Sequence, residues 1–192
     1  MVESKRDLVD SFDDEKLIFE AKKGNLFSFE KLVKCYQKKI YYLAYRMTKD
    51  HDAADDIAQE TFIKAYYSLQ KFKEGYGFFP WIYRVCMNLA INYLKRQKFT
   101  VSESVAFPQM ERKEAVDFDP LIILINEEKK VKIENAIEKL PPPFKAVFVL
   151  KVYEDLSYED ISKALNISKG TVMSRLFRAR ERLIKELKCE AS

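Results

Sequence analysis

Glycine and proline are rare in this chain, and long stretches contain neither residue. Only 4 glycines and 6 prolines occur among the 192 residues. Because both residues interrupt helices, their absence over long stretches predicts a mostly helical protein. The run Pro141-Pro142-Pro143 must end a helix, because proline lacks the N–H that a helix needs and its ring clashes with the preceding turn.

Helical periodicity divides the chain into three parts. It is present over residues 14–98, lapses over residues 99–120 and returns over residues 121–187. The middle part is acidic, since seven acidic and two basic residues lie between Thr100 and Glu128, a net charge of −5. We therefore expect an all-α fold in which two small helical domains are joined by a flexible acidic linker.

The composition argues against an enzyme and against a metal or cofactor site. Cys35, Cys86 and Cys189 lie far apart and His51 is the only histidine, so no zinc-ligand spacing occurs. The chain has no glycine-rich phosphate loop and no nucleophile–base pair around the histidine. We expect no catalytic residues, no metal and no cofactor.

No segment predicts insertion into a membrane. Residues 1–14 are polar and acidic and lack the apolar centre of a signal peptide. No uninterrupted apolar run approaches the membrane-spanning length of about 20 residues. We expect a cytoplasmic protein.

A helix-turn-helix pattern lies between Ser157 and Lys188. Ser157 and Asp160 have the spacing of a capping box, which predicts the start of a short helix that buries Ile161 and Leu165. A tight turn at residues 166–168 follows, and Ser168 is placed to cap the next helix. The apolar residues of this second helix share one predicted buried stripe: Val172, Leu176, Ala179, Leu183 and Leu187.

A basic stripe lies beside the apolar stripe on the second helix. Between Lys169 and Lys188 there are seven basic and two acidic residues, a net charge of +5. At about 100° per residue, the basic arc contains Thr171, Arg175, Arg178, Arg182 and Lys185. A helix with these two stripes fits the major groove of DNA while it stays anchored to its domain. A solvated basic face or an acidic partner is the alternative, and the short helix-turn-helix spacing favours DNA.

Residues 52–66 form a helical string with two different faces. The predicted buried stripe is Ala54, Ala58, Phe62, Ala65 and Leu69. The opposite arc carries acidic and amide side chains around one apolar residue, Ile63. An apolar group in a polar surround suggests a protein interface, and a solvated acidic face is the alternative.

Aromatic, amide and basic side chains gather in the next segment. The loop at residues 72–80 combines two glycines with exposed-looking aromatics, and the helix expected at residues 81–98 contains no acid. Such side chains suit single-stranded DNA, because bases stack on rings, amides hydrogen-bond to base edges and cations hold phosphates. The alternative is that Phe78, Phe79 and Trp81 belong to the core, toward which Ile82, Cys86, Leu89 and Tyr93 also turn.

The C-terminal helix pair resembles region 4 of bacterial sigma factors, most closely the extracytoplasmic-function (ECF) subfamily of the sigma-70 family. The matching segments are Leu140-Pro141, Phe144–Leu150, Leu156–Ile161, Gly170–Val172, Ser174–Leu176 and Arg178–Arg180. In that family this domain binds the minus-thirty-five promoter element. The resemblance implies base contacts by Ser174, Phe177 and Arg178, phosphate contacts by Arg175, Arg180 and Arg182, and further upstream contacts by Lys169 and Thr171. Met173 stands where many relatives carry a basic residue, so we expect the sequence preference to differ there.

The N-terminal part resembles sigma region 2. Residues 52–66 are similar to region 2.2, which binds a coiled coil of the largest catalytic subunit of RNA polymerase, and the implied interface is Asp52, Asp55, Asp56, Gln59, Glu60 and Ile63. Residues 72–98 are similar to regions 2.3 and 2.4, which melt and read the minus-ten element. The implied contacts there are Tyr76, Phe78, Trp81, Arg84, Asn88, Asn92, Lys95 and Arg96. Pro80 stands where family members often carry Ser or Thr.

The resemblance implies a dissociable initiation factor rather than an enzyme. Residues 14–98 would be region 2, residues 99–126 the linker and residues 127–190 region 4. The implied partners are core RNA polymerase, promoter DNA in duplex and single-stranded form, and an anti-sigma factor. The linker would thread through the polymerase near the path of nascent RNA, and an inert spacer is the alternative.

Two other classes of protein are weighed against this interpretation. A repressor or activator that binds an operator as a homodimer would need a dimerisation surface and a sensor domain, and neither is evident. A protein-only adaptor such as an anti-sigma factor is disfavoured by the two basic helices.

Overall fold

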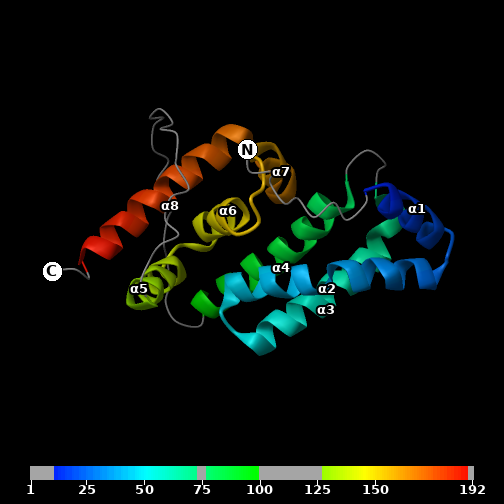
Figure 1. Ribbon diagram of the computed structural model, residues 1–192, viewed down its shortest axis with the longest axis horizontal. Helices are drawn as coiled ribbons and strands as arrows, with labels where there is room; N and C mark the ends of the chain where they lie inside the picture. The colour runs from blue at the N-terminus through cyan, green and yellow to red at the C-terminus, as the bar shows by residue number, and fades with distance from the viewer. Residues whose placement is uncertain (1–10, 73–76, 100–126, 190–192) are drawn as a thin grey trace.

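The computed structural model describes residues 11–72, 77–99 and 127–189. Within these ranges the protein is helical and contains no strand (Figure 1). The first block, residues 11–99, contains α1 (Ser11–Lys22), α2 (Leu26–Thr48), α3 (His51–Ser68), the 3-10 helix η1 (Leu69–Lys71) and α4 (Phe78–Phe99). The second block, residues 127–189, contains α5 (Glu127–Glu138), α6 (Pro142–Val152), α7 (Tyr158–Leu165) and α8 (Lys169–Cys189). The predicted linker, residues 100–126, and Tyr76 lie outside the described residues.

Local capping residues set the ends of α2 and α3. The side chain of Asn25 accepts hydrogen bonds from the amides of Phe27 and Ser28, which fixes the start of α2. α2 ends where Lys49 adopts a left-handed conformation, with φ of 57°. Asp50 then caps α3 by accepting from the amide of Ala53 at 3.1 Å. The chain therefore turns between two long helices within two residues.

α3 is buried more widely than its predicted stripe. Ala54, Ala65 and Leu69 are buried as expected, whereas Phe62 is half-buried. Ile57 and Thr61 are also buried, and the Thr61 hydroxyl donates to the carbonyl of Ile57 at 2.7 Å. The extra burial arises because α3 packs against both α2 and α4, so that two adjoining arcs of α3 are covered.

α4 also differs from the prediction, in its start and in its buried surface. It begins at Phe78, three residues before the expected Trp81, because the first turn of a helix accepts Pro80 without losing a hydrogen bond. Ile82 and Cys86 are buried as predicted. A second arc, formed by Tyr83, Met87 and Ala90, is fully buried as well, and the sequence pattern gave no sign of it.

The second block follows the predicted helix boundaries closely. α5 ends at Glu138, before the three prolines as predicted, and α6 begins at Pro142, so that Pro142 and Pro143 lie in its first turn. Ser157 caps α7, and the Ser168 hydroxyl accepts from the amide of Thr171 at the start of α8, also as predicted. The buried residues of α7 are Ile161 and Ala164; Leu165, expected to be buried, is half-buried because the helix ends there.

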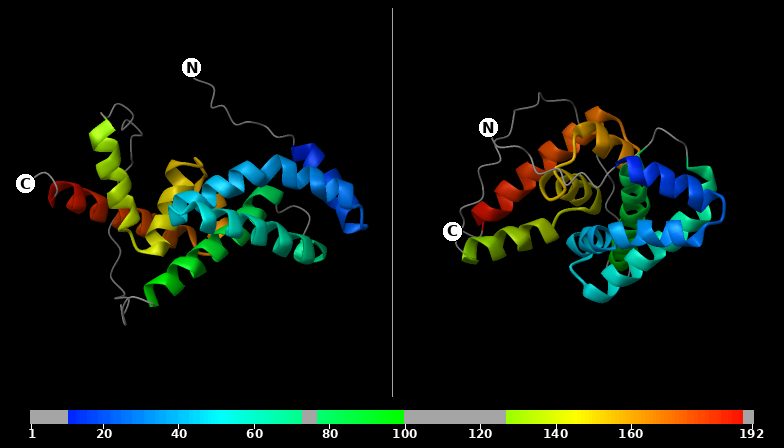
Figure 2. Two further views of the ribbon diagram at one scale, coloured as in Figure 1. Left: turned by 90° about the horizontal axis from the view of Figure 1, so that it is seen from below. Right: turned by 45° about the vertical axis from the view of Figure 1, so that its right-hand side comes forward.

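One hydrophobic core runs through both blocks. It joins side chains of α1–α4 to side chains of α6, α7 and α8, including Val147, Leu150, Ile161 and Val172. α6 contacts α2 and α4, and α7 contacts α4; both views of Figure 2 show the blocks side by side. A smaller cluster packs α5 and α6 against the outer part of α8. The two predicted helical domains are present, and their packing against each other is a finding that the sequence did not predict.

Polar contacts lie at the boundary between the blocks. Lys145 of α6 is 3% exposed, and its ammonium donates to the carbonyl of Met47 near the end of α2 at 2.7 Å. Glu154, which follows α6, pairs with Arg46 of α2 and accepts from the Tyr83 hydroxyl of α4 at 2.8 Å. Both contacts join residues far apart in the sequence, so they fix how the blocks are oriented.

Candidate polymerase and nucleic-acid interfaces

α3 presents its predicted polymerase-binding face to the outside. All six residues assigned to it are exposed: Asp52, Asp55, Asp56, Gln59, Glu60 and Ile63. Ile63 is 55% exposed although it is apolar, and Glu60 pairs with Lys64 at 2.8 Å. The face therefore combines exposed carboxylates with one accessible apolar side chain, which suits contact with a basic protein surface.

Two tyrosines extend this face toward the C-terminal end of α3. Tyr67 is 79% exposed, and Tyr66 is 38% exposed with its ring edge-on to Phe29. Aromatic side chains are enriched in protein interfaces because they bury large areas at a small entropic cost. Neither tyrosine was predicted for this face: Tyr66 is the last residue of the 52–66 string and Tyr67 follows it.

α4 carries its predicted polar arc on the surface. Arg84, Asn88, Asn92 and Lys95 are exposed, and Trp81 at the head of the arc is half-buried. Arg96 is also exposed, about 40° around the helix from Asn92 and about 100° from Lys95. Amide donors, amide acceptors and cations thus lie in one row with no acidic residue among them, as single-stranded nucleic acid requires.

The aromatic residues at the start of α4 are less available than expected. Phe78 is 3% exposed and packs edge-on against Tyr36 and Phe72, so the expectation that it contacts DNA is corrected: it is a core residue in this structure. Trp81 packs against Phe72 with ring centroids 5.2 Å apart, and it keeps part of its ring accessible. Clustered aromatics bury one another because their area is large.

A groove of about 460 Å³ lies on the surface between α3 and α4. Its α4 wall consists of Asn88 and Asn92, which were expected to contact DNA, together with the apolar side chains of Val85 and Leu89. The α3 wall was not anticipated, and it consists of Lys64, Tyr67, Ser68 and the adjoining Lys71 of η1. A groove with amides on one wall and cations with an exposed ring on the other has the features of a site for an extruded base and its phosphate.

α8 collects most of the predicted upstream contacts on one arc. Thr171, Ser174, Arg175, Arg178 and Arg182 lie within about 100° of one another. Ser174 and Arg182 are exposed, and the other three are half-buried. Burial lowers the pKa of the Arg175 guanidinium from its usual value. Arg175 stays charged because the ordinary pKa of an arginine is very high. Its burial also means that it has lost part of its hydration before it meets a phosphate.

Other predicted contacts lie elsewhere on α8. Arg180 falls about 160° around the helix from Arg178, and Phe177 about 100° from it, so they do not share its arc. Met173 lies on the same side as Phe177 and Arg180 and is 38% exposed. The guanidinium of Arg182 stacks 5.3 Å from the ring centre of Phe144, which holds it near α6.

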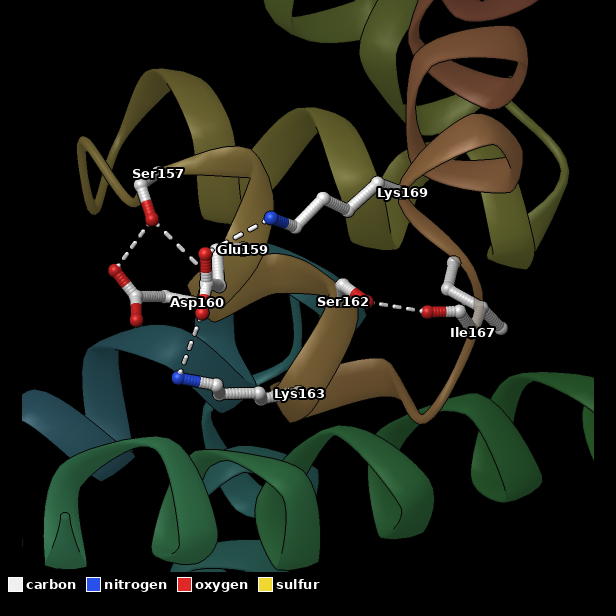
Figure 3. A network of polar contacts seen from close by, with 7 residues as sticks. All are labelled: Ser157, Glu159, Asp160, Ser162, Lys163, Ile167 and Lys169. Carbon is white, nitrogen blue, oxygen red and sulfur yellow. Dashed lines mark hydrogen bonds and ion pairs between the residues drawn. The ribbon is translucent and has the colours of Figure 1, made fainter. Parts of the chain in front are cut away.

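Hydrogen bonds and ion pairs fix the turn between α7 and α8 (Figure 3). The Ser157 hydroxyl accepts from the amide of Asp160 and donates to its carboxylate. The Ser162 hydroxyl donates to the carbonyl of Ile167 at 2.6 Å, which ties the end of α7 to the turn. Glu159 of α7 accepts from Lys169 of α8 at 2.9 Å. The angle between the two helices is therefore held by side chains as well as by the core.

Comparisons with known proteins follow the same division of the chain. The family model "Sigma-70 region 2" matches residues 32–100, and "Sigma-70, region 4" matches residues 130–183. The ECF RNA polymerase sigma factor SigW of Bacillus subtilis is 36% identical over 183 residues, which cover 91% of this chain and 96% of that protein.

The chain belongs to the ECF group of the sigma-70 family. As a sigma factor it is a transcription initiation factor and not an enzyme. The resemblance found in the sequence is thereby confirmed.

Solved structures show that the fold is shared as well. CnrH in complex with the cytosolic domain of CnrY superimposes with a TM-score of 0.66 at 21% identity, over 92% of this chain and 98% of that one. The sigma factor RpoE of Bartonella quintana, in complex with the anti-sigma factor NepR, superimposes with a TM-score of 0.59 at 22% identity, over 83% and 96%. No helix among the described residues is long and apolar enough to cross a membrane.

Proposed function

We propose that this ECF sigma factor binds core RNA polymerase through the exposed face of α3, directs it to specific promoters and promotes DNA melting. In this proposal residues 14–98 act as region 2, residues 99–126 as the linker and residues 127–190 as region 4. The polymerase supplies the chemistry, and the protein acts in the cytoplasm, where that enzyme transcribes.

The observation that carries the proposal is that one chain exposes three chemically different surfaces. The α3 face is acidic with one accessible apolar residue, Ile63. The α4 arc and its groove are amide-rich and basic, and the α8 arc is basic beside a buried stripe. A protein surface, an unpaired strand and a duplex are the partners whose chemistry these surfaces complement.

The groove between α3 and α4 supports a role in melting. Extruding a base costs a few kcal/mol of stacking and pairing, so a pre-formed site is needed to offset it. Asn88 and Asn92 offer both donors and acceptors to a base edge, and Lys64 and Lys71 lie on the facing wall at positions suited to phosphates. We assign the minus-ten strand to this groove, with Trp81 and Arg84 at one end of the α4 arc and Lys95 at the other.

The duplex contact belongs to α8 in this proposal. Ser174 and Arg178 share one arc, so both can reach base edges in the major groove at once. Arg182 and Arg175 follow on the same side of that arc, about 40° and 60° around the helix from Arg178, and are placed to hold phosphates. Phe177 and Arg180 can contribute only at the edge of the groove, because the helix turns them away from Arg178.

We also propose regulation by an anti-sigma factor that masks these surfaces until a signal arrives. Support comes from the similarity in fold to a sigma factor solved with an anti-sigma factor. The acidic linker is assigned to the polymerase channel near the path of nascent RNA, where its net charge of −3 over residues 99–126 would imitate nucleic acid. Removing residues 103–119 tests this assignment, which fails if the rate of initiation and the abortive products are unchanged.

Reconstituted transcription tests the proposed function as a whole. The protein is added to core RNA polymerase and a library of promoter-bearing templates, and the transcripts are sequenced. We expect transcripts that start at defined positions and share upstream elements. Tight operator binding without polymerase, together with no specific transcripts when polymerase is present, would show a repressor or activator instead.

A further inference from the structure

The carboxylate of Glu159 connects the two helices of the helix-turn-helix. Glu159 is the second residue of α7, and its Oε2 lies 2.9 Å from the Lys169 ammonium at the first residue of α8. Its other oxygen, Oε1, lies 3.2 Å from the ammonium of Lys163, one turn further along α7. Figure 3 shows both contacts converging on the one carboxylate. These hydrogen bonds, first from Lys169 and then from Lys163, hold the pKa of Glu159 below its ordinary value.

These ion pairs are too exposed to contribute much to the stability of the fold. The side chains of Glu159, Lys163 and Lys169 are 54%, 45% and 61% exposed. Pairs that face water gain little from their attraction, because solvent screens the charges and the side chains lose freedom. The angle between the helices is fixed independently by the Ser162 bond to Ile167 and by the buried core. A role of this carboxylate in binding is therefore the better explanation.

The position of Lys169 indicates what the binding partner is. Lys169 begins α8, and the first turns of a recognition helix are the part that approaches DNA. Free ammonium groups at that point would bind phosphates of any sequence. Glu159 already pairs with Lys169 at that point and with Lys163 on α7, so a phosphate must displace the carboxylate or be repelled by it.

We infer that Glu159 sets the affinity of α8 for duplex DNA by holding Lys163 and Lys169 away from phosphates. This inference rests on the proposed function, in which α8 contacts the duplex. The carboxylate lowers the phosphate-dependent part of binding, which is the same for every sequence. It leaves the base contacts of Ser174 and Arg178 on their own arc unaffected. The upstream contact is then too weak to hold DNA alone and becomes effective when polymerase holds both together.

Salt-dependent binding of the full-length protein tests the inference. The probe is a fluorescein-labelled duplex of arbitrary fixed sequence, about three helical turns long, and its anisotropy is followed at several salt concentrations. E159Q removes the charge and keeps the size of the side chain. We expect it to raise affinity roughly tenfold at low salt. The slope of log affinity against log salt should steepen by about 1–2, since each lysine that gains a phosphate adds about 0.9.

A matched control and a paired variant isolate the mechanism. E186Q makes the same charge change in another glutamate–lysine pair, that of Glu186 with Lys139. Glu186 lies toward the far end of α8, and Lys139 directly follows α5. It should leave the salt slope unchanged. K169Q is combined with E159Q to separate the contributions of the two lysines. In the E159Q background it should remove about half of the gained slope, because one of the two freed cations is lost.

The outcomes separate this inference from the function on which it rests. If R182A, which removes a proposed phosphate contact, weakens duplex binding while E159Q leaves affinity and slope at the wild-type values, α8 is a DNA-binding helix and the role of Glu159 is refuted. If E159Q weakens binding, Glu159 orients Lys169 for DNA and the inference is likewise overturned. If R182A and E159Q both bind as the wild type does, α8 does not contact duplex DNA, and the proposed function fails first. Melting temperatures equal to that of the wild type verify that each variant is folded.

Discussion

The ammonium of Lys145 lies 2.7 Å from the main-chain carbonyl oxygen of Met47, so a side chain of the second block closes the end of a helix of the first. Carbonyls in the last turn of a helix have no partner within the helix, and a buried one needs a donor from elsewhere. Lys145 is 3% exposed and supplies it. Specific polar bonds as well as apolar contact therefore hold the two blocks together.

Replacing Lys145 should loosen this packing. K145A leaves the Met47 carbonyl without this donor and removes buried methylene groups, so the free energy of unfolding should fall by about 2–4 kcal/mol. Urea titration followed by circular dichroism measures the change. K132A, at an exposed position of α5, should stay within about 0.5 kcal/mol of the wild type. Equal stability of K145A and the wild type would show that the contact is unimportant.

Arg46 and Glu154 should be energetically coupled across the same boundary. Glu154 is 11% exposed and also accepts from Tyr83, so its geometry is well fixed. A double-mutant cycle of R46M and E154Q should give a coupling energy of about 1–2 kcal/mol. The exposed pair Glu30–Lys34 is the comparison, with about 0.5 kcal/mol or less expected. Additive effects of R46M and E154Q would contradict the coupling.

Stability should fall at alkaline pH because of buried acidic groups. Burial raises the pKa of the Cys86 thiol to about 12 from the ordinary value of 9.0, and burial also raises that of the Tyr83 phenol. Their stabilising contribution is fully present below the ordinary pKa. It is lost as pH rises toward the folded value, because only the unfolded chain ionises.

Cys86 should account for a measurable part of this dependence. Between pH 9 and 12 each such group lowers the free energy of unfolding by up to about 1.4 kcal/mol per pH unit. Urea titrations of the wild type and C86A at several pH values should therefore give a shallower slope for C86A. Parallel slopes would mean that the Cys86 thiol ionises in the folded protein as readily as in the unfolded one.

Asp56→Arg should impair binding to core polymerase while the fold stays intact. Asp56 is exposed on the α3 face, so reversing its charge costs little stability and places a cation against a basic partner. We expect affinity for core polymerase to drop by about tenfold or more, equivalent to at least 1.4 kcal/mol, in a fluorescence competition assay. E15R, an exposed charge reversal on α1, is the control. Unchanged binding by D56R would remove the α3 face from the interface.

Local signals in the sequence were sufficient for the helix ends and for the outward arcs. Ser157, Ser168 and Pro142 mark helix starts through their own backbone chemistry, which depends only on near neighbours. The row from Arg84 to Lys95 follows from the helical repeat and from the absence of apolar residues in it. Such features need no knowledge of what packs against the helix.

Features that depend on the contact between the blocks were not predictable in the same way. Tyr83 and Met87 lie outside the buried stripe that was predicted for α4. They are buried because the second block covers that side of α4. A lysine is expected at the surface. Lys145 is buried where its ammonium donates to the Met47 carbonyl in the last turn of α2, a contact that the sequence does not reveal. The groove wall of Lys64 and Tyr67 required the packing of α3 against α4. Sequence periodicity says which face is apolar, and it does not say how many neighbours that helix has.

The central claim is that one chain presents two DNA contacts on the polymerase, and site-specific photocrosslinking tests it directly. A photoreactive amino acid replaces Ser174 on α8 or Asn92 on α4, and the promoter complex is irradiated. With core polymerase present, position 174 should crosslink to duplex DNA upstream. Position 92 should crosslink to a single strand roughly 20 base pairs downstream, about two helical turns. Crosslinks of both positions to one DNA site, or the same pattern without polymerase, would contradict the account.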